Sequence, residues 1–432
     1  MEPLDSPVDG LIEIDGAGYY AVPNVDQMPP FFMSVVSDGD RWMFISTSGA
    51  LTAGRHDAAG ALFPYETDDR LHQAAGKIGP VTALRVGQRT WSPFRDQRNA
   101  PVRRNLYKSV VGDVIIFEED HFDLGLTFRY RWSSCDEFGF VRTASVTNRG
   151  TEKVAVDLID GLVNVLPHGL TPAVYNGMSN LTNAYKRSEV IDGRLAIFSM
   201  EAAVVDKPEP AESLRGSVVW SMGLEQAALT LAADAIGAFE MGSPTDLVSR
   251  VTGKPGAYLL SATIDLEAGA TESWRIVADA AQDQVDVARL HKLLTDSPNM
   301  AAEVDASLVE ATRHLEQIMA PADAMQRTGD RVATAHHFSN TTYNVFRGGV
   351  PLDGYTISRT RFAQFVHERN RAVADRHTGW LDTLPEEFDH GRLVSDAETL
   401  GDAHMVRLCH EYLPFAFSRR HGDPSRPWNA FS

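Results

Sequence analysis

A stretch of strictly alternating side chains, residues 124–132, constrains the fold of this chain more than any other feature. Leu124, Leu126, Phe128, Tyr130 and Trp132 fall on one side of an extended backbone, and a glycine, a threonine and two arginines fall on the other. Because successive side chains of a strand point to opposite faces, the pattern predicts a half-buried strand with an aromatic inner face.

Further apolar runs flank this strand on both sides. Residues 114–117 precede it, residues 138–141 follow it and residues 154–166 come next, separated by turn-like segments at 133–136 and 148–150. Strands joined by short turns, with no helix between them, form antiparallel sheets. A large antiparallel sheet buries one face, commonly against a second sheet, so we expect a β-sandwich.

Other segments extend the same pattern toward both ends of the region. Residues 31–36 and 42–45 predict a hairpin, and residues 46–70 predict a long irregular loop. Residues 258–264 and 274–277 flank a short turn and predict a hairpin that forms the last strand pair of the sandwich.

The hydrophobic period changes from two to 3.6 near Asp283, where helices should begin. We expect two helices between residues 287 and 319, a third from about 358 to 384 ended by Pro385, and a fourth over 402–417. The predicted division is an antiparallel β-sandwich over residues 1–283, a helical linker over 284–330 and a helical region over 331–432.

Composition excludes several classes of partner. The chain has 58 acidic and 40 basic residues and a net charge of -18, which argues against nucleic acid and against an anionic membrane surface. Cys135 and Cys409 are the only cysteines, so reduced buried thiols are expected rather than a metal site. No apolar run approaches the roughly 20 residues of a spanning helix, and we predict a cytoplasmic protein.

The order of a large sandwich, a helical linker and further helices resembles the cellobiose and chitobiose phosphorylase family and the related cyclic β-1,2-glucan synthases. Several segments carry the resemblance. They are the Gly-rich loop and acidic pair at 48–55, 62–65 and 68–69, the strand segments 124–127, 141–148 and 154–158, and the later segments 341–349 and 419–429.

The resemblance implies a galactose-mutarotase-like β-supersandwich, an α-helical linker and the start of an α/α toroid. It also implies inverting phosphorolysis of β-linked gluco-oligosaccharides, with inorganic phosphate as co-substrate and no other cofactor. The ligand would be an oligosaccharide or a sugar phosphate, and the sandwich would form a homodimer interface.

The catalytic residues of such an enzyme are not assigned in this sequence. The family's general acid is an aspartate in an Asp-Trp-Asn-Asp-Gly-type segment, and this chain has no such segment. A toroid needs twelve helices, which about 150 residues cannot supply. We therefore expect the chain to be the N-terminal part of a longer phosphorylase or hydrolase-like enzyme and to lack the catalytic acid itself. The alternative is a reduced relative that lacks catalysis.

The densest group of binding side chains lies near the end of the sequence. It consists of Arg419, Arg420, His421, Asp423, Arg426 and Trp428, stiffened by two prolines. Arginine binds phosphate through paired hydrogen bonds. We therefore predict that this segment binds substrate. We predict the same role for Arg347, which precedes two glycines. The alternative is a charged loop with Trp428 buried in a core, and a plain turn at Arg347.

Three weaker patterns have structural explanations. The carboxylates within residues 118–123 suggest a glycosidase pair, but a solvated hairpin loop is preferred. His336 and His337 are adjacent and point in different directions, so no metal site is expected there. Residues 91–98 resemble a sugar-contact loop in composition only, and no Ser/His/Asp signature is present.

The sequence is compatible with two other functions. One is a non-catalytic carbohydrate-binding or assembly module, which would bind sugar without turnover. The other is a mutarotase-like sugar epimerase, which would change optical rotation without phosphate.

Overall fold

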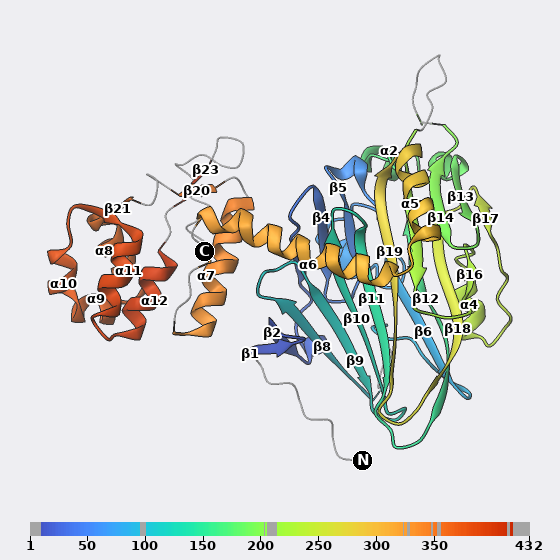
Figure 1. Ribbon diagram of the computed structural model, residues 1–432, viewed down its shortest axis with the longest axis horizontal. Coiled ribbons are helices and arrows are strands. Elements are labelled where there is room, and N and C mark those ends of the chain that lie inside the picture. Colours follow the sequence, from blue (N-terminus) through green and yellow to red (C-terminus); the bar gives the residue numbers. More distant parts are fainter. Residues whose placement is uncertain are drawn as a thin grey trace. The chain divides into compact units, whose positions relative to one another are not determined.

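The computed structural model describes residues 10–95, 101–202, 204, 214–322, 324–325, 329–346, 349–351, 356–412 and 415–417. The chain divides into two compact units, Met1–Thr312 and Arg313–Ser432 (Figure 1).

The first unit is built on a large antiparallel sheet of eleven strands among the described residues. In spatial order these are β1 (Gly10–Ile14), β2 (Ala17–Pro23), β8 (Val102–Ser109), β9 (Ile115–His121), β10 (Leu126–Cys135), β11 (Gly139–Asn148), β19 (Thr271–Gln282), β15 (Gly216–Met222), β14 (Leu195–Met200), β13 (Lys186–Ile191) and β17 (Arg250–Thr252).

Two smaller antiparallel sheets complete the β-structure of this unit. The first contains, in spatial order, β16 (Ala228–Thr230), β18 (Gly256–Leu266), β12 (Val154–Val165), β6 (Gly79–Val86) and β7 (Arg89–Trp91). The second contains β3 (Phe32–Val35), β4 (Arg41–Ser46) and β5 (Leu51–Arg55). The hairpin predicted over residues 31–45 is confirmed by the pairing of β3 with β4.

One continuous core lies between these sheets, which confirms the predicted β-sandwich. The alternation that predicted it is present in β10, because Leu126, Phe128, Tyr130 and Trp132 are each at most 2% exposed. Four aromatic or branched side chains of one strand therefore bury most of their surface, which stabilises the sandwich by roughly 1.5–3 kcal/mol for each side chain.

The chain crosses between the two large sheets at two arches. β11 leads into β12 and β18 leads into β19, yet neither pair is hydrogen-bonded, because each partner lies in a different sheet. The expected last hairpin over residues 258–277 is therefore wrong. The buried Asn148 amide joins both arches by donating to the carbonyl oxygens of Glu152 (2.8 Å), Leu266 (3.1 Å) and Glu267 (3.2 Å).

Helices cover the outer faces of the sandwich. α5 (Gln284–Asp296) and α6 (Met300–Met319) place Leu290, Leu294 and Val304 in a cluster with side chains of the large sheet. α4 (Ala235–Glu240) packs on the outer side of the five-stranded sheet. The shorter helices of this unit are α1 (Asp68–His72), α2 (Pro172–Gly177) and α3 (Ser179–Ala184).

The change from strand to helix falls at Asp283. β19 ends at Gln282, and the Asp283 side chain accepts hydrogen bonds from the amides of Val285 and Asp286 at the start of α5. These bonds satisfy amides that a helix leaves unpaired at its first turn. The proposed domain boundaries stay predictions.

The second unit is mainly helical. It contains α7 (Arg331–Phe346), α8 (Arg359–Arg369), α9 (Arg371–Arg376), α10 (Thr378–Thr383), α11 (His390–Glu398) and α12 (Ala403–Glu411). Two short strand pairs join it, β20 (Gly349–Pro351) with β23 (Phe415–Phe417) and β21 (Thr356–Ser358) with β22 (Glu387–Asp389). Its core centres on buried Phe362, Val366, Leu393 and Leu408.

Two helix predictions for this unit are wrong. The single helix expected over residues 358–384 is divided at Asn370 and His377. Asn370 ends α8 and caps α9, because its Oδ1 accepts a hydrogen bond from the amide of Val373 at 3.2 Å. The helix expected over 402–417 ends at Glu411, and Phe415–Phe417 forms β23. The toroid itself stays a prediction.

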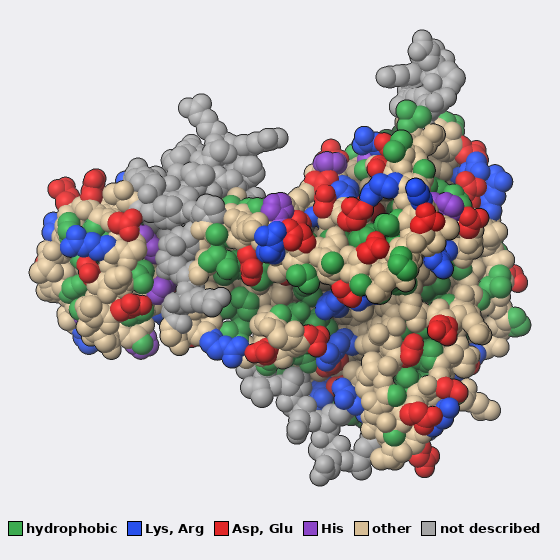
Figure 2. Space-filling view, viewed as in Figure 1, with side chains coloured by type: hydrophobic (Ala, Val, Ile, Leu, Met, Phe, Trp, Pro, Cys, Tyr) green, Lys and Arg blue, Asp and Glu red, His purple; other side chains and the backbone are tan. Residues whose placement is uncertain are grey.

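Two surface properties bear on partners. On the face drawn in Figure 2, acidic and basic side chains of the described residues are interspersed over the sandwich unit, without a broad basic stripe. Within the described ranges, no helix combines the length and the apolar character that crossing a membrane requires.

Candidate functional site

A small pocket enters the first unit beside the middle of β10. It is lined by the turn between β4 and β5, the segment between α1 and β6, the first residues of β6, residues 93–95, and the side chains of Tyr130 and Arg142. We call it the Tyr130 pocket. Segments far apart in sequence form its wall, so no contiguous motif marks it.

Gly49 lets the β4–β5 turn approach the floor of this pocket. Its φ is +85°, and an added Cβ would lie 2.5 Å from the Tyr130 hydroxyl oxygen. Only glycine meets both conditions without strain. Burial raises the pKa of Tyr130 above its ordinary value, so the hydroxyl keeps its proton and can donate a hydrogen bond.

The base of the pocket is a fully buried ion pair between Arg142 and Asp160. Arg142 Nη1 lies 2.6 Å from Asp160 Oδ2, and neither side chain is exposed. Asp160 also accepts hydrogen bonds from Thr82 Oγ1 and Trp274 Nε1, each at 2.6 Å. Arg142 Nε has no partner among the described residues, although the guanidinium lies 4.8 Å from the Tyr130 ring centroid. One buried charged donor therefore has no hydrogen-bond partner among the described residues.

Phe94 forms an aromatic wall in a strained backbone conformation. Its φ is +62°, and its amide donates to Glu119 Oε2 at 2.7 Å. Glu119 also accepts from Trp91 Nε1 (2.6 Å) and Arg104 Nε (2.7 Å). The Phe94 ring meets the Tyr130 ring edge-on at 5.2 Å. A buried carboxylate thus holds a conformation that costs about 1–3 kcal/mol, as at many binding sites.

The charges of the pocket are balanced. Arg95 Nη1 lies 2.7 Å from Glu240 Oε1, and Arg142 is neutralised by Asp160. The described lining contains hydroxyl groups, guanidinium N–H donors and aromatic rings, but no carboxylate. Such a lining suits a small polar neutral molecule better than a cation.

A chain of polar contacts, two hydrogen bonds and one ion-pair contact, leads from the pocket wall to the surface. Ser48 Oγ lies 3.0 Å from Ser46 Oγ, which lies 2.6 Å from His72 Nδ1. His72 Nε2 lies 3.0 Å from Asp68 Oδ1. The expectation of an irregular loop over residues 46–70 is wrong, because β5 and the start of α1 lie within it and place these groups together.

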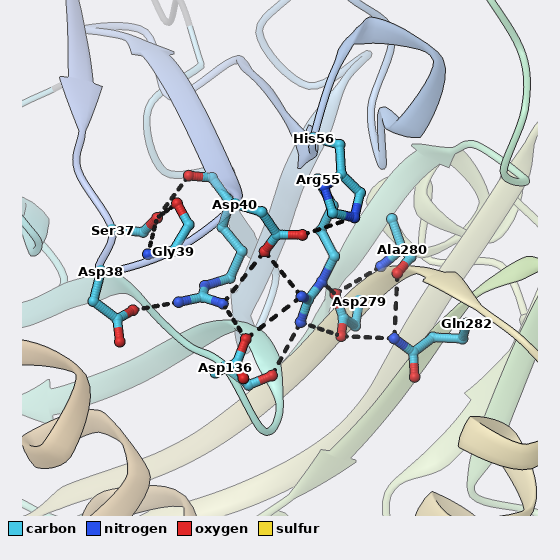
Figure 3. Close-up of polar contacts among 11 residues, drawn as sticks. Ser37, Asp38, Gly39, Asp40, Arg55, His56, Asp136, Asp279, Ala280 and Gln282 are labelled. Carbon is cyan, nitrogen blue, oxygen red and sulfur yellow. Dashed lines mark hydrogen bonds and ion pairs between the residues drawn. The ribbon is translucent and has the colours of Figure 1, made fainter. Parts of the chain in front are cut away.

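A second polar cluster joins β4 and β5 to the large sheet (Figure 3). Arg55 donates through Nε (2.8 Å) and Nη2 (3.0 Å) to Asp279 on β19, and through Nη1 to Asp40 (3.0 Å). Arg41 pairs with Asp38 and, at 2.8 Å, with Asp136 in the β10–β11 turn. We call this the Arg41–Arg55 clasp. Each carboxylate of the clasp is paired with an arginine, so we assign the clasp a structural role.

The sequence predicts seven substrate-binding residues. Arg347, Arg419, Arg420, His421, Asp423, Arg426 and Trp428 all lie outside the described residues. Their role in binding stays a prediction.

The expectation of a solvated hairpin loop over residues 118–123 is wrong. Glu118, Glu119 and Asp120 lie in β9 and are at most 6% exposed. Burial raises the pKa of Glu118, but the charge and hydrogen bonds of Arg129 outweigh this and leave the pKa below its ordinary value. Asp120 accepts from Arg103 Nη2 at 2.8 Å. Paired cations explain how these acids are buried.

The structure offers no metal centre within its described part. No group of three or more His, Cys, Asp and Glu side chains there is arranged to hold an ion. His337 is buried in α7 and His336 is exposed, consistent with side chains that point apart.

Sequence patterns alone did not predict the chain of polar contacts from Ser48 to Asp68. The two serines are two residues apart in a turn, and Asp68 and His72 are four apart on α1. The i,i+4 spacing of Asp68 and His72 on one helix face was the only available signal. Their approach to the serines depends on the packing of α1 against β4.

The architecture is thus a large antiparallel β-sandwich with a pocket in its wall, followed by a separate helical unit. Residues 353–414 of that unit match the family model of glycoside hydrolase family 149 insertion domain 1. The match covers β21 to α12 and leaves the sandwich outside it. No curated protein matches this sequence.

Several solved structures are similar to this chain at low sequence identity. A candidate kojibiose phosphorylase from the human microbiome aligns with 9% identity and a TM-score of 0.36, over 80% of this chain and 40% of that protein. A candidate aldose 1-epimerase from Escherichia coli K12 aligns with 10% identity and a TM-score of 0.29, over 58% of this chain and 99% of that protein. Heparan sulfate lyase from Pedobacter heparinus aligns with 9% identity and a TM-score of 0.29, over 59% and 35%.

Proposed function

We propose that this chain contributes to a carbohydrate-active enzyme of the glycoside phosphorylase type. The observation that carries the proposal is the match of residues 353–414 to an insertion domain from glycoside hydrolase family 149. The order of sandwich, helices α5 and α6, and a further helical unit is consistent with it. In this proposal the helices after α6 begin an α/α toroid, and the substrate is a β-linked gluco-oligosaccharide.

Inverting phosphorolysis places a clear demand on the chemistry. A carboxylic acid must protonate the glycosidic oxygen while phosphate attacks the anomeric carbon from the opposite face. That acid must hold its proton near neutral pH, which requires a raised pKa. Glu118 fails this test because Arg129 lowers its pKa, and Glu119 is committed to three donors. We therefore assign no buried carboxylate of β9 to the acid.

The balanced charge of the Tyr130 pocket favours a second candidate function, a sugar-binding module without turnover. Its lining of hydroxyl, guanidinium and aromatic groups contains no carboxylate among the described residues. Neutral sugars are bound by such combinations of donors and rings. In this reading the sandwich binds one sugar unit and does not cleave it.

One experiment separates the two functions. The chain is incubated with β-linked gluco-oligosaccharides, with and without inorganic phosphate, and products are measured by chromatography. Sugar 1-phosphate formed only with phosphate supports the phosphorylase. Free sugar formed without phosphate contradicts it and indicates hydrolysis. Calorimetric binding without any product supports the sugar-binding module, and a sedimentation run on the same sample tests the predicted homodimer.

A further inference from the structure

Ser48, Ser46 and His72 are linked by hydrogen bonds and Asp68 lies in ion-pair contact with His72, which is the order of groups that activates a nucleophilic serine. A serine hydroxyl is a weak nucleophile unless a base accepts its proton, and the base works best when a carboxylate orients it. Here His72 Nε2 lies 3.0 Å from Asp68 Oδ1, and His72 Nδ1 lies 2.6 Å from Ser46 Oγ. Ser46 in turn lies 3.0 Å from Ser48.

The two serines have different access to the pocket. Ser46 is completely buried, so no substrate can reach its hydroxyl. Ser48 is partly exposed and lines the Tyr130 pocket. The turn is held by Gly49 N to Ser46 O and Ser46 N to Ala50 O, both 2.8 Å. Ser48 is therefore the group that meets a ligand, and Ser46 is the link to the base.

The same pocket contains groups that can stabilise a developing oxyanion. Arg142 lines it, is fully buried, and has an Nε–H with no partner among the described residues. Tyr130 lines it too and keeps its hydroxyl proton because burial raises its pKa. Preorganised donors in a site that excludes water stabilise the negative charge of a tetrahedral intermediate.

We propose that the Tyr130 pocket is an esterase site in which Ser48 cleaves small carboxylic esters, with Ser46, His72 and Asp68 as positioning residues. Ser48 Oγ bonds to the ester carbonyl carbon while its proton passes to Ser46, and the Ser46 proton passes to His72 Nδ1. The acyl C–O bond then breaks, and the leaving alkoxide recovers a proton through Ser46. Water repeats these steps on the acyl-serine, releasing the carboxylic acid. The proposal is independent of glycoside phosphorolysis.

The direct test uses the unmodified chain and needs no variant. The chain is treated with a fluorophosphonate probe, digested, and mapped by mass spectrometry. We expect the label on Ser48 and turnover of p-nitrophenyl acetate that the probe abolishes. Label on another residue, or turnover that persists after complete labelling, overturns the assignment.

Variants test the roles separately. Ser48→Ala should lower kcat/KM for p-nitrophenyl acetate at least about 100-fold. His72→Gln and Asp68→Asn should lower kcat with KM unchanged, and Asp68→Glu should restore part of kcat. His56→Ala is the matched control, because His56 also pairs with an aspartate, Asp40 at 3.0 Å, but does not line the pocket. Equal losses in His56→Ala and His72→Gln, or full activity in Ser48→Ala, contradict the proposal.

Discussion

The Arg55 guanidinium on β5 holds the Asp279 carboxylate on β19 through two hydrogen bonds, Nε to Oδ1 at 2.8 Å and Nη2 to Oδ2 at 3.0 Å. These residues lie 224 positions apart, and Asp279 is only 5% exposed. The pair thus fastens the small β3–β5 sheet to the large sheet, at the centre of the clasp in Figure 3.

Removing Arg55 should strongly destabilise the sandwich unit. Arg55→Ala leaves a buried carboxylate without its cation, which typically costs about 3–5 kcal/mol. Denaturant unfolding followed by tryptophan fluorescence measures the change in free energy. The control is Arg187→Ala, whose partner Glu189 is about one third exposed, and we expect a loss below about 1 kcal/mol there. Similar losses in both variants would show that the clasp does not join the sheets.

Asn148 should be the most sensitive polar residue of the two arches. Asn148→Ala removes two amide N–H donors, which are shared among three carbonyl oxygens, and one hydrogen bond accepted from the Gly150 amide. With about 1 kcal/mol net for each bond, we expect a loss of roughly 2–4 kcal/mol. Thr147→Ala, which removes only the exposed contact with Thr271, is the control. A loss under about 1 kcal/mol in Asn148→Ala would contradict the arch assignment.

The sequence predicted the sandwich because apolar and non-apolar side chains alternate strictly over residues 124–132. The inward positions of Phe128 and Tyr130 follow from a period of two, which needs no knowledge of the rest of the fold. The connection from β18 to β19 could not be predicted in the same way. A short turn is compatible with a hairpin or with a crossing between sheets. Here the crossing is stabilised by the Asn148 amide, which belongs to a strand distant in sequence and donates to the carbonyl oxygens of Leu266 and Glu267.

The pocket was less predictable than the fold, and for a physical reason. Ser46 and His72 meet because α1 packs beside β4, and Arg142 comes from β11 to line the same pocket as Ser48. Proximity of this kind depends on tertiary packing, not on local spacing. Asn370 shows the same limit for helices, since the apolar stripe of residues 358–384 continues across a break set by one capping side chain.

Filling the space above Tyr130 should close the pocket. Gly49→Ala places a methyl group 2.5 Å from the Tyr130 hydroxyl oxygen in a conformation that disfavours alanine. We expect a loss of about 1–3 kcal/mol in unfolding free energy and weaker binding of any pocket ligand. Thermal melting and calorimetric titration measure both effects. Gly87→Ala, with a positive φ but open space around its Cβ, is the control for strain alone.

Lys186 gives the sandwich unit a stability that depends on pH. It is 2% exposed at the start of β13, its Nζ has no partner among the described residues, and the Tyr175 ring centroid lies 5.3 Å away. Burial lowers the pKa of Lys186 from 10.5 to about 8. Between these values the unfolded chain binds more protons than the folded one, so the free energy of unfolding rises with pH. Below pH 8 both states are protonated, and the folded state bears the full cost of a buried charge.

Lys186→Met removes that cost together with the contact to Tyr175. The pKa shift of Lys186 corresponds to roughly 3 kcal/mol of unfolding free energy. Losing the cation–π contact with Tyr175 reduces this gain by about 1 kcal/mol. We therefore expect the variant to be more stable than the wild type at pH 7, with a difference that shrinks by pH 9.5, before tyrosines titrate. Urea unfolding at both pH values measures it, and Lys153→Met, at a half-exposed lysine, should show no such change. A difference between wild type and Lys186→Met that is equal at pH 7 and pH 9.5 would mean that Lys186 is not desolvated.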